Sequence, residues 1–164
     1  MARTREPVES APTETRTETR SFRLPTPLLE TLRRYSRESG ISVNELAHRY
    51  LDEGLRRSAH PLITFRDAAG GRRPVLSGTR LDVAQVIETV RNARARGRAA
   101  AREAAEYLGI TEAQVRECIR YYGGYRDEVD AWIDRMHAIS EREEEASRQE
   151  SALLDEGADG TQLR

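Results

Sequence analysis

One short strand followed by two helices, with no second strand close behind it, is the feature that most constrains how this chain folds. Polar residues alternate with Phe22 and Leu24 towards the end of residues 15–24, and this period of two predicts a strand. Pro25 ends it, because proline cannot continue a strand ladder. A lone strand leaves its backbone hydrogen-bonding groups without partners. The cheapest partner is the same strand of a second copy, so the sequence predicts an obligate homodimer.

Two amphipathic helices are predicted after the strand, and they meet at Gly40. We expect the first helix to begin near Thr26 as N-cap, with Pro27 at the first helical position, and to end before Gly40. Its apolar side chains recur at helical spacing: Leu28, Leu32 and Tyr35. The second helix opens with Ser42 and Glu45 in the order of a capping box. The N-terminus of this helix has unpaired backbone amides and the positive end of the helix dipole, which predict a phosphate-binding site at residues 42–44.

The run FRLPTPLLETLRRYSRESGISVNELAHRYLDEGL resembles the Arc/MetJ/CopG ribbon-helix-helix repressors without a gap. The resemblance implies that two copies lay a shared ribbon in the major groove of DNA. It implies base reading by alternate strand residues, here Thr19, Ser21 and Arg23. It also implies DNA-backbone contacts by Ser42, Val43 and Asn44. Short hydroxyls replace the family's long amides at the first two reading positions, so Arg23 is the expected strong contact, bonded to a guanine edge.

Residues 58–139 predict a second, mainly helical domain. Strands are expected at 62–65 and 74–76, with a turn at 67–73 and a continuation at 79–81. Helices are expected from Val83 to about Ala95, over 100–108, from Thr111 to the Gly123–Gly124 pair, and from Tyr125 to about Arg142. Asp82 and Thr111 are the N-cap candidates.

Two of these expected helices, joined at Gly109, form a helix-turn-helix pattern. Gln114, Arg116 and Arg120 of the second helix then face a DNA groove. Such pairs of helices are also common as simple packing, and a structural or dimerising role remains the alternative. The two interpretations stay open at the level of sequence.

The same half of the chain resembles a second family. RRPVLSGTRLDVAQVI is similar to the hairpin of the C-terminal domain of VapB-type antitoxins, and IRYYGGYRDEVD is similar to a later stretch of that domain. The resemblance covers about residues 60–137 and departs from the family at Ser77, where a basic residue is common. It implies an antitoxin whose partner is a PIN-like ribonuclease toxin.

An apolar face on the last expected helix predicts the toxin-binding anchors Trp132, Ile133 and Met136. The alternative is that this face packs on its own domain and that only the segment from Ser140 is free. Residues 127–164 carry 4 Arg and 12 acidic residues, a net charge of −8, whereas residues 61–126 carry 12 Arg and 7 acidic residues, a net charge of +5. A basic body with an acidic tail fits a DNA-binding protein whose tail meets a basic protein or shields the basic surface. The alternative is a solvated, disordered tail without such a role.

Composition narrows the classes of protein further. Polar residues 1–15 and acidic residues 140–164 are predicted to be disordered. The single Cys argues against a disulfide framework and favours a cytoplasmic location, and no apolar run is long enough to span a membrane. The three His are scattered, so no zinc site or cofactor is predicted. Cys118 lies on an apolar face and is expected in the core, and we predict no enzyme.

The sequence therefore predicts a mainly α protein with a ribbon-helix-helix dimer at 16–57 and a small helical domain at 58–139, which has a β-hairpin and a helix-turn-helix-like core. The predicted function is that of a type II antitoxin, which represses its own operon through operator DNA and neutralises a PIN-like ribonuclease. Whether dimers associate further on DNA stays open. The alternatives are a free-standing transcriptional repressor without a toxin, and a dimeric assembly module that binds no DNA.

Overall fold

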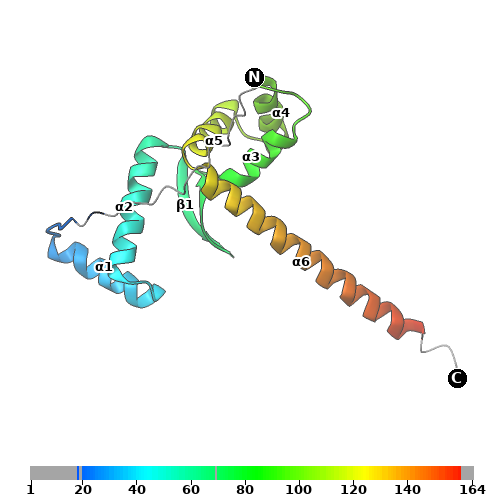
Figure 1. Ribbon diagram of the computed structural model, residues 1–164, viewed down its shortest axis with the longest axis horizontal. Helices are drawn as coiled ribbons and strands as arrows, with labels where there is room; N and C mark the ends of the chain where they lie inside the picture. The colour runs from blue at the N-terminus through cyan, green and yellow to red at the C-terminus, as the bar shows by residue number, and fades with distance from the viewer. Residues whose placement is uncertain (1–17, 19, 69, 160–164) are drawn as a thin grey trace, which may run out of the picture. The chain divides into compact units, whose positions relative to one another are not determined.

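The computed structural model describes residues 18, 20–68 and 70–159, and this part of the chain is mainly helical. Its regular structure consists of six helices and a two-stranded antiparallel sheet (Figure 1), which confirms the predicted mainly helical class. The chain divides into two compact units, Met1–Leu46 and Ala47–Arg164. The division falls inside α2 (Val43–Ala59), and each unit is described by itself. No helix of the described residues is long and apolar enough to cross a membrane.

The first unit contains α1 (Thr26–Ser39) and the first turn of α2. The N-cap of α1 is Pro25, one residue before the expected Thr26, so Pro27 lies at the second helical position and not at the predicted first. Gly40 ends the helix in the left-handed conformation, with φ of 71°, and its amide donates to the Ser36 carbonyl at 2.9 Å. The first turn of α2 is positioned by Ser42, whose hydroxyl accepts from the amide of Glu45 at 3.2 Å.

The segment before α1 is in neither a helix nor a strand of the single chain, over residue 18 and residues 20–25. The strand predicted for residues 15–24 falls partly on residues 15–17 and 19, which lie outside the described residues. Residues 1–15, for which we predicted disorder, lie outside them as well. No second strand is present in the described part of the first unit, so the segment has nothing within that unit to pair with.

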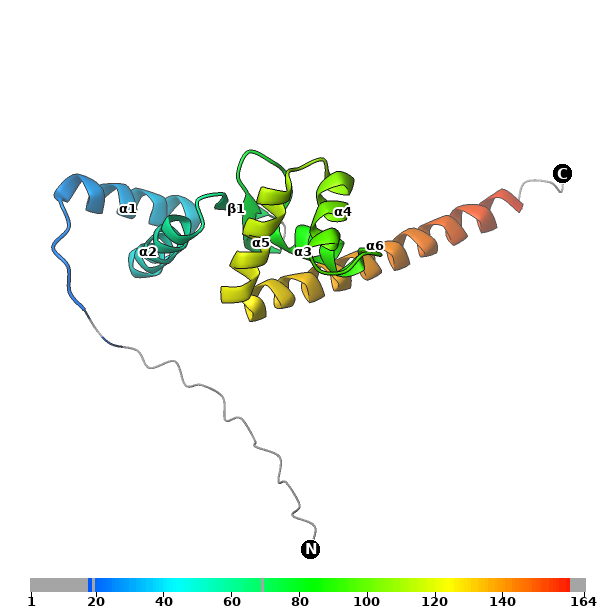
Figure 2. The same cartoon turned by 90° about the horizontal axis from the view of Figure 1, so that it is seen from above.

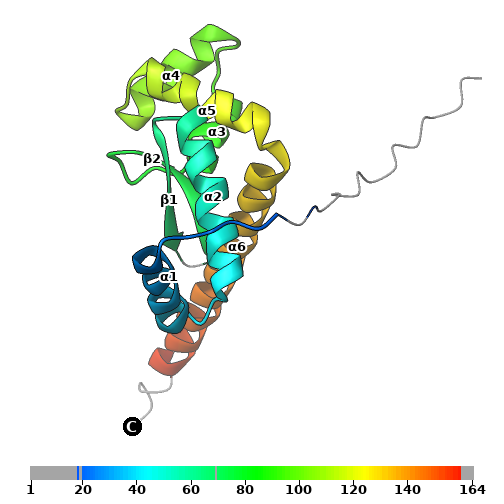
Figure 3. The ribbon, with the colours of Figure 1, turned by 90° about the vertical axis from the view of Figure 1, so that its left-hand side faces the viewer.

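The hairpin of the second unit consists of β1 (Ile63–Ala68) and β2 (Gly71–Leu76), which lie side by side in Figure 3. Their register runs from Ile63 opposite Leu76 to Ala68 opposite Gly71. The turn is therefore much shorter than the predicted 67–73. Positive φ angles of 90° at Gly70 and 123° at Gly71 allow this tight reversal, which side-chain-bearing residues rarely adopt.

Three helices in mutual contact follow the hairpin: α3 (Val83–Asn92), α4 (Arg98–Leu108) and α5 (Glu112–Gly124). The predicted N-caps are confirmed. Asp82 accepts from the Gln85 backbone amide and Thr111 from the Gln114 backbone amide. In each case the side-chain oxygen of the glutamine accepts in turn from the backbone amide of the cap residue. The helix α3 ends at Asn92, earlier than the expected Ala95, because Glu103 of α4 accepts from the amides of Arg94 and Ala95 and holds the loop.

The last helix, α6 (Arg126–Asp159), is longer than expected. We predicted a helix to about Arg142 and disorder from residue 140, but α6 continues to Asp159. Residues 140–156 contain no glycine or proline and are rich in Glu, Arg, Gln and Ala, which favour helix. Figure 2 shows α3 and α5 beside the N-terminal half of α6 and the C-terminal half extending beyond them. Residues 140–151 are exposed.

The core of the second unit lies between the hairpin and helices α3 to α6. Its largest fully buried side chains are Tyr121, Ile63, Leu76, Val75, Val83, Val86, Val115, Val129 and Cys118. Small side chains of α4, Ala101, Ala104 and Ala105, allow that helix to approach the core closely. The first unit has no comparable core, because its buried apolar side chains among the described residues are Leu32 and Leu46.

Candidate nucleic-acid and partner surfaces

The predicted base-reading residues lie at the N-terminal end of the described chain. Ser21 and Arg23 are exposed, and Thr19 lies outside the described residues. The apolar residues that alternate with them are exposed too, since Phe22 is 74% and Leu24 is 44% accessible. Both faces of this segment therefore meet solvent in the single chain. A segment with one polar and one apolar face is suited to cover a partner with the apolar face.

The predicted DNA-backbone residues form the first turn of α2. Ser42 and Asn44 are exposed, while Val43 is half-buried. Ser42 holds the Glu45 amide, which leaves the amides of Val43 and Asn44 without partners inside the helix. An exposed helix start of this kind can accept a phosphate oxygen, although its geometry alone does not identify a ligand.

Apolar side chains that would close a core in the first unit remain open to solvent. Leu28 and Tyr35, predicted on the apolar face of α1, are 48% and 41% exposed, whereas Leu32 of the same face is buried. On the part of α2 that belongs to the second unit, Leu51 and Leu55 are 58% and 72% exposed. Monomeric proteins rarely leave so many large apolar groups exposed within one short stretch.

The predicted toxin anchors lie on a face of α6 that is largely buried within the second unit. Trp132 and Ile133 are only 6% and 5% exposed, and they belong to the core of the second unit. Met136 packs against the same core. The Trp132 indole covers the hairpin turn, because a Cβ atom added at Gly70 would lie 3.4 Å from its Cη2 atom. The structure therefore favours the alternative in which this face packs on its own domain, since burying it there already satisfies its apolar surface.

A polar and aromatic cluster fixes the C-terminal half of α2 to the rest of the second unit. The Arg56 guanidinium bonds Glu128 of α6, donates to the Tyr121 hydroxyl at 2.9 Å, and lies 2.8 Å from Asp52. It also stacks on the Tyr125 ring at 4.1 Å from the ring centroid. Burial raises the pKa of Tyr121, so its hydroxyl stays neutral and can accept this bond.

Two further pairs of polar side chains connect the C-terminal half of α2, and His60 that follows this helix, to elements distant in the sequence. Glu53, which is 9% exposed, receives two bonds from Arg72 of β2, one of them at 2.8 Å. His60 Nδ1 lies 3.1 Å from Glu117 Oε1, and Glu117 is 2% exposed. Sequence reasoning missed these pairs, because the partners are 19 and 57 residues apart and no local pattern marks them.

The side chains expected to face a groove from α5 differ in their surroundings. Gln114 is engaged in the capping box at Thr111. Arg116 bonds Glu112 at 3.1 Å and Arg120 bonds Glu117, yet 56% and 65% of these two arginine side chains remain exposed. Both guanidiniums therefore reach solvent from the same side of the helix, four residues apart.

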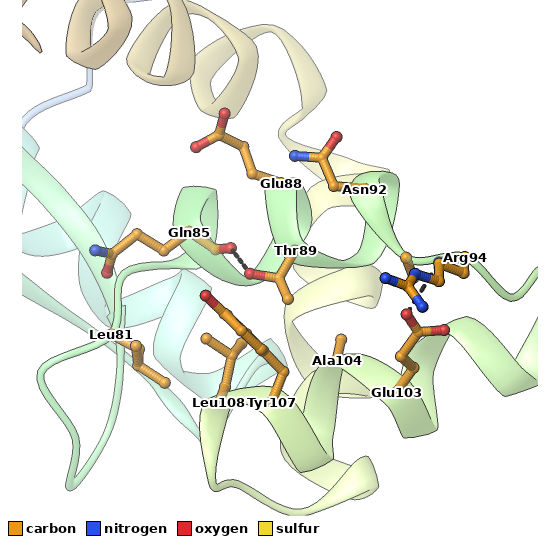
Figure 4. A pocket seen from close by; sticks show the side chains of 11 residues that line it. Leu81, Gln85, Glu88, Thr89, Asn92, Arg94, Glu103, Ala104, Tyr107 and Leu108 are labelled. Carbon is orange, nitrogen blue, oxygen red and sulfur yellow. Dashed lines mark hydrogen bonds between the residues drawn. The ribbon is translucent and has the colours of Figure 1, made fainter.

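An open groove of about 550 Å³ separates α3 and α4 (Figure 4). It is lined by Leu81, Gln85, Glu88, Thr89, Asn92, Ala93, Arg94, Glu103, Ala104, Tyr107 and Leu108. Several polar groups of the lining already have partners, since Thr89 donates to the Gln85 carbonyl and Glu103 holds two backbone amides. The walls combine both signs of charge, and no convergent set of catalytic groups emerges from them.

Cys118 is buried in the core, as expected. Burial raises the pKa of its thiol to about 12, so the nucleophilic thiolate is scarce at neutral pH. Among the described residues, no group of three His, Cys, Asp or Glu side chains is placed to hold a metal ion.

Comparisons with known proteins place no external constraint on these surfaces. Neither a family model, nor a curated protein, nor a solved structure matches the chain.

Proposed function

We propose that two copies of this chain pair residues 18–24 as an antiparallel ribbon and that the resulting dimer binds operator DNA. The observation that carries the proposal is the exposed apolar face of the first unit: Phe22, Leu24, Leu28 and Tyr35. A second copy would cover this face and supply the missing strand partner. The backbone groups would then be hydrogen-bonded and the apolar side chains removed from water. With the apolar side chains turned inward, Ser21 and Arg23 of both copies lie on the outer face of the ribbon.

Charge and helix geometry support DNA as the ligand of the ribbon. Arg23 has no acidic partner within 4.0 Å among the described residues, so its guanidinium is available for a base edge or a phosphate. The exposed start of α2 at Ser42 supplies free amides for a phosphate. In this proposal the ribbon contacts bases and specifies the DNA sequence, whereas the start of α2 contacts phosphates and fixes the register of the protein on the duplex.

Substitutions at Arg23 and Ser42 separate these two roles. Arg23→Ala is expected to cost about 1–3 kcal/mol of binding at one base pair in each half-site and to relax the preference there. Ser42→Ala is expected to weaken binding to all sequences alike, because phosphates carry no base identity. Fluorescence anisotropy with a set of single-base operator variants measures both effects. An unchanged preference in Arg23→Ala contradicts base reading by the ribbon.

We further propose that the protein is an antitoxin that neutralises a PIN-like ribonuclease, with the C-terminal half of α6 as the inhibitory segment. Support comes from the VapB-like motifs and from five exposed glutamates at 141, 143, 144, 145 and 150. An enzyme that binds RNA needs a basic surface, and an acidic helix is complementary to it. We therefore assign the proposed contact to the exposed half of α6 and not to Trp132, which is buried.

Truncation after Ser140 tests the inhibitory segment. We expect the truncated protein to lose affinity for the toxin and to show a weaker dependence of binding on salt, because most of the acidic side chains are gone. DNA binding through residues 18–46 should persist. Unchanged toxin affinity and salt dependence would assign the contact to another surface of the second unit.

Two rival functions remain distinguishable by experiment. A repressor without a toxin binds DNA but yields no complex when co-expressed with the product of the adjacent gene. An assembly module dimerises but binds no duplex at any salt concentration. A gel shift with the upstream DNA and a pull-down of the neighbouring product together separate the three functions.

A further inference from the structure

Four arginines line the solvent-facing side of α4 and α5, and we call them the arginine strip: Arg98, Arg102, Arg116 and Arg120. Arg98 and Arg102 are four residues apart on α4, and Arg116 and Arg120 are four residues apart on α5, so each pair shares one side of its helix. Glu112 joins the two pairs, because it lies 3.3 Å from Arg102 and 3.1 Å from Arg116. The four guanidiniums therefore belong to one continuous surface.

Three acidic groups lie near the strip, fewer than its arginines, and two of them, Glu112 and Glu117, are less exposed than the arginines that they pair with. Glu117 turns inward to His60 and is 2% exposed, which leaves the Arg120 side chain 65% exposed on the outer side. Glu112 is 39% exposed and is shared by two arginines. Glu106, one turn beyond Arg102, is the exposed acid that borders the strip. The surface is net positive, and its ion pairs are solvent-exposed and therefore weak enough to exchange partners.

The α5 part of this surface has small residues on either side of its arginines. Ala113 and Gly123 lie on the same side of the helix as Arg116 and Arg120, and both are exposed. A helix with small side chains at the ends of its exposed face and arginines between them can approach a broad surface closely. The diameter of such a helix, about 10–12 Å, matches the width of a B-DNA major groove, about 12 Å.

We propose that the arginine strip binds the phosphates of duplex DNA, as a second contact beyond the ribbon of residues 18–24. Duplex DNA is favoured over an acidic protein segment because an arginine that anchors a protein interface is held in a packed, desolvated pocket, usually with Trp or Tyr, whereas Arg102, Arg116 and Arg120 are 56–68% exposed. The strip has Ile119, 37% exposed, as the large apolar side chain beside it on α5. Tyr107 is on α4 but lines the groove towards α3 instead. Repeated guanidiniums on a surface poor in anchors suit an extended polyanion.

Paired substitutions in the full chain test the strip with a mixed-sequence duplex as the probe. Arg116→Gln with Arg120→Gln, and separately Arg98→Gln with Arg102→Gln, should each weaken binding about tenfold at about 0.1 M salt. Each pair should also reduce the slope of log K against log salt by about one to two units. The second pair leaves Glu117 and its partners untouched, so it remains informative if the first pair unfolds the domain. Circular dichroism verifies the fold of each variant.

The matched control is Arg142→Gln with Arg148→Gln on α6, which removes the same charge from an exposed helix outside the strip. The control should bind the duplex with the wild-type slope. If both strip variants bind like the control, the strip does not contact nucleic acid. If they keep duplex binding but lose affinity for a peptide of residues 140–159, the strip is a surface for acidic protein, and the proposal is overturned.

Titrations with the upstream DNA separate this proposal from the ribbon proposal, because a mixed-sequence duplex does not report on base reading. Arg23→Gln measured on that DNA beside the strip variants reports on the ribbon alone, because Arg23 belongs to the other unit. A loss of affinity in the strip variants with none in Arg23→Gln supports the strip and contradicts the ribbon. The opposite pattern supports the ribbon and contradicts the strip.

Discussion

Trp132→Ala should lower the free energy of unfolding of the second unit by about 3–5 kcal/mol, because truncating a buried aromatic side chain opens a cavity. Trp132 is 6% exposed, and the cavity would lie beneath the hairpin turn, where the ring approaches Gly70. Arg73 and Arg135 lose their ring partner as well, since both guanidiniums lie over the indole, at 5.7 and 5.4 Å from its centroid. We expect the melting temperature to fall by roughly 10 °C or more.

Trp132→Phe is the matched control for this substitution. Phenylalanine keeps most of the apolar volume and removes only the interaction of the indole N–H with the buried Asp82 carboxylate. Its expected cost is below about 1.5 kcal/mol. Circular dichroism is the appropriate probe of unfolding, because the protein has a single Trp and both substitutions remove its tryptophan fluorescence. Equal stability of Trp132→Ala and the wild type would show that this face is not part of the core.

Phe22→Ala should raise the dissociation constant of the dimer by about 100-fold or more. The Phe22 side chain is 74% exposed in the single chain, and the proposed ribbon would bury it against a second copy. A truncation that costs about 3 kcal/mol at such a site corresponds to about two orders of magnitude in affinity. Because folding and association are linked, the wild-type melting temperature should rise with protein concentration. Sedimentation equilibrium measures the dissociation constants.

Tyr107→Ala provides the control for the ribbon substitution. Tyr107 is an equally large aromatic side chain, is 82% exposed, and lies on α4 of the other unit. Its removal should leave dimerisation unchanged. A wild-type protein that sediments as an 18.6 kDa monomer at every concentration, with a melting temperature independent of concentration, would contradict the shared ribbon.

Features with a local signature could be predicted from the sequence. The caps at Asp82 and Thr111 follow from polar residues placed three positions before a glutamine, and the structure confirms both. The end of α1 at Gly40 follows from the freedom of glycine to adopt a positive φ. These signals lie within a few residues of the feature that they predict, so no knowledge of the tertiary structure is needed.

Features that depend on distant partners could not be predicted in this way. Helical spacing identified the apolar face of Trp132 but not what the face contacts, and its own hairpin proved to be the neighbour. The bond between Arg56 and Glu128 joins residues 72 positions apart, and neither residue has a sequence signal for the other. The helix α6 exceeds its predicted length because the acidic composition that predicts disorder is also one with good helix propensity.

The sequence predicts which residues would contact DNA. The dimer that would bring them together stays a prediction, because it requires a second chain. Arg23 and Ser42 are exposed as expected, which is compatible with ligand contact but common on any surface. The arginine strip became visible only once α4 and α5 were placed together through Glu112. Helix spacing alone gives each pair of arginines, and the packing of the two helices unites them.

Selection of bound duplexes from a random pool by the full-length protein tests the central claim most directly. A dimer that reads DNA with two equivalent ribbons should enrich an inverted repeat, with a guanine-containing pair at equivalent positions of the two half-sites, because protein two-fold symmetry is mirrored in the site. Enrichment of such a repeat by the wild type is the predicted result. A pool that stays unenriched, or that converges on a site without two-fold symmetry, would contradict the account.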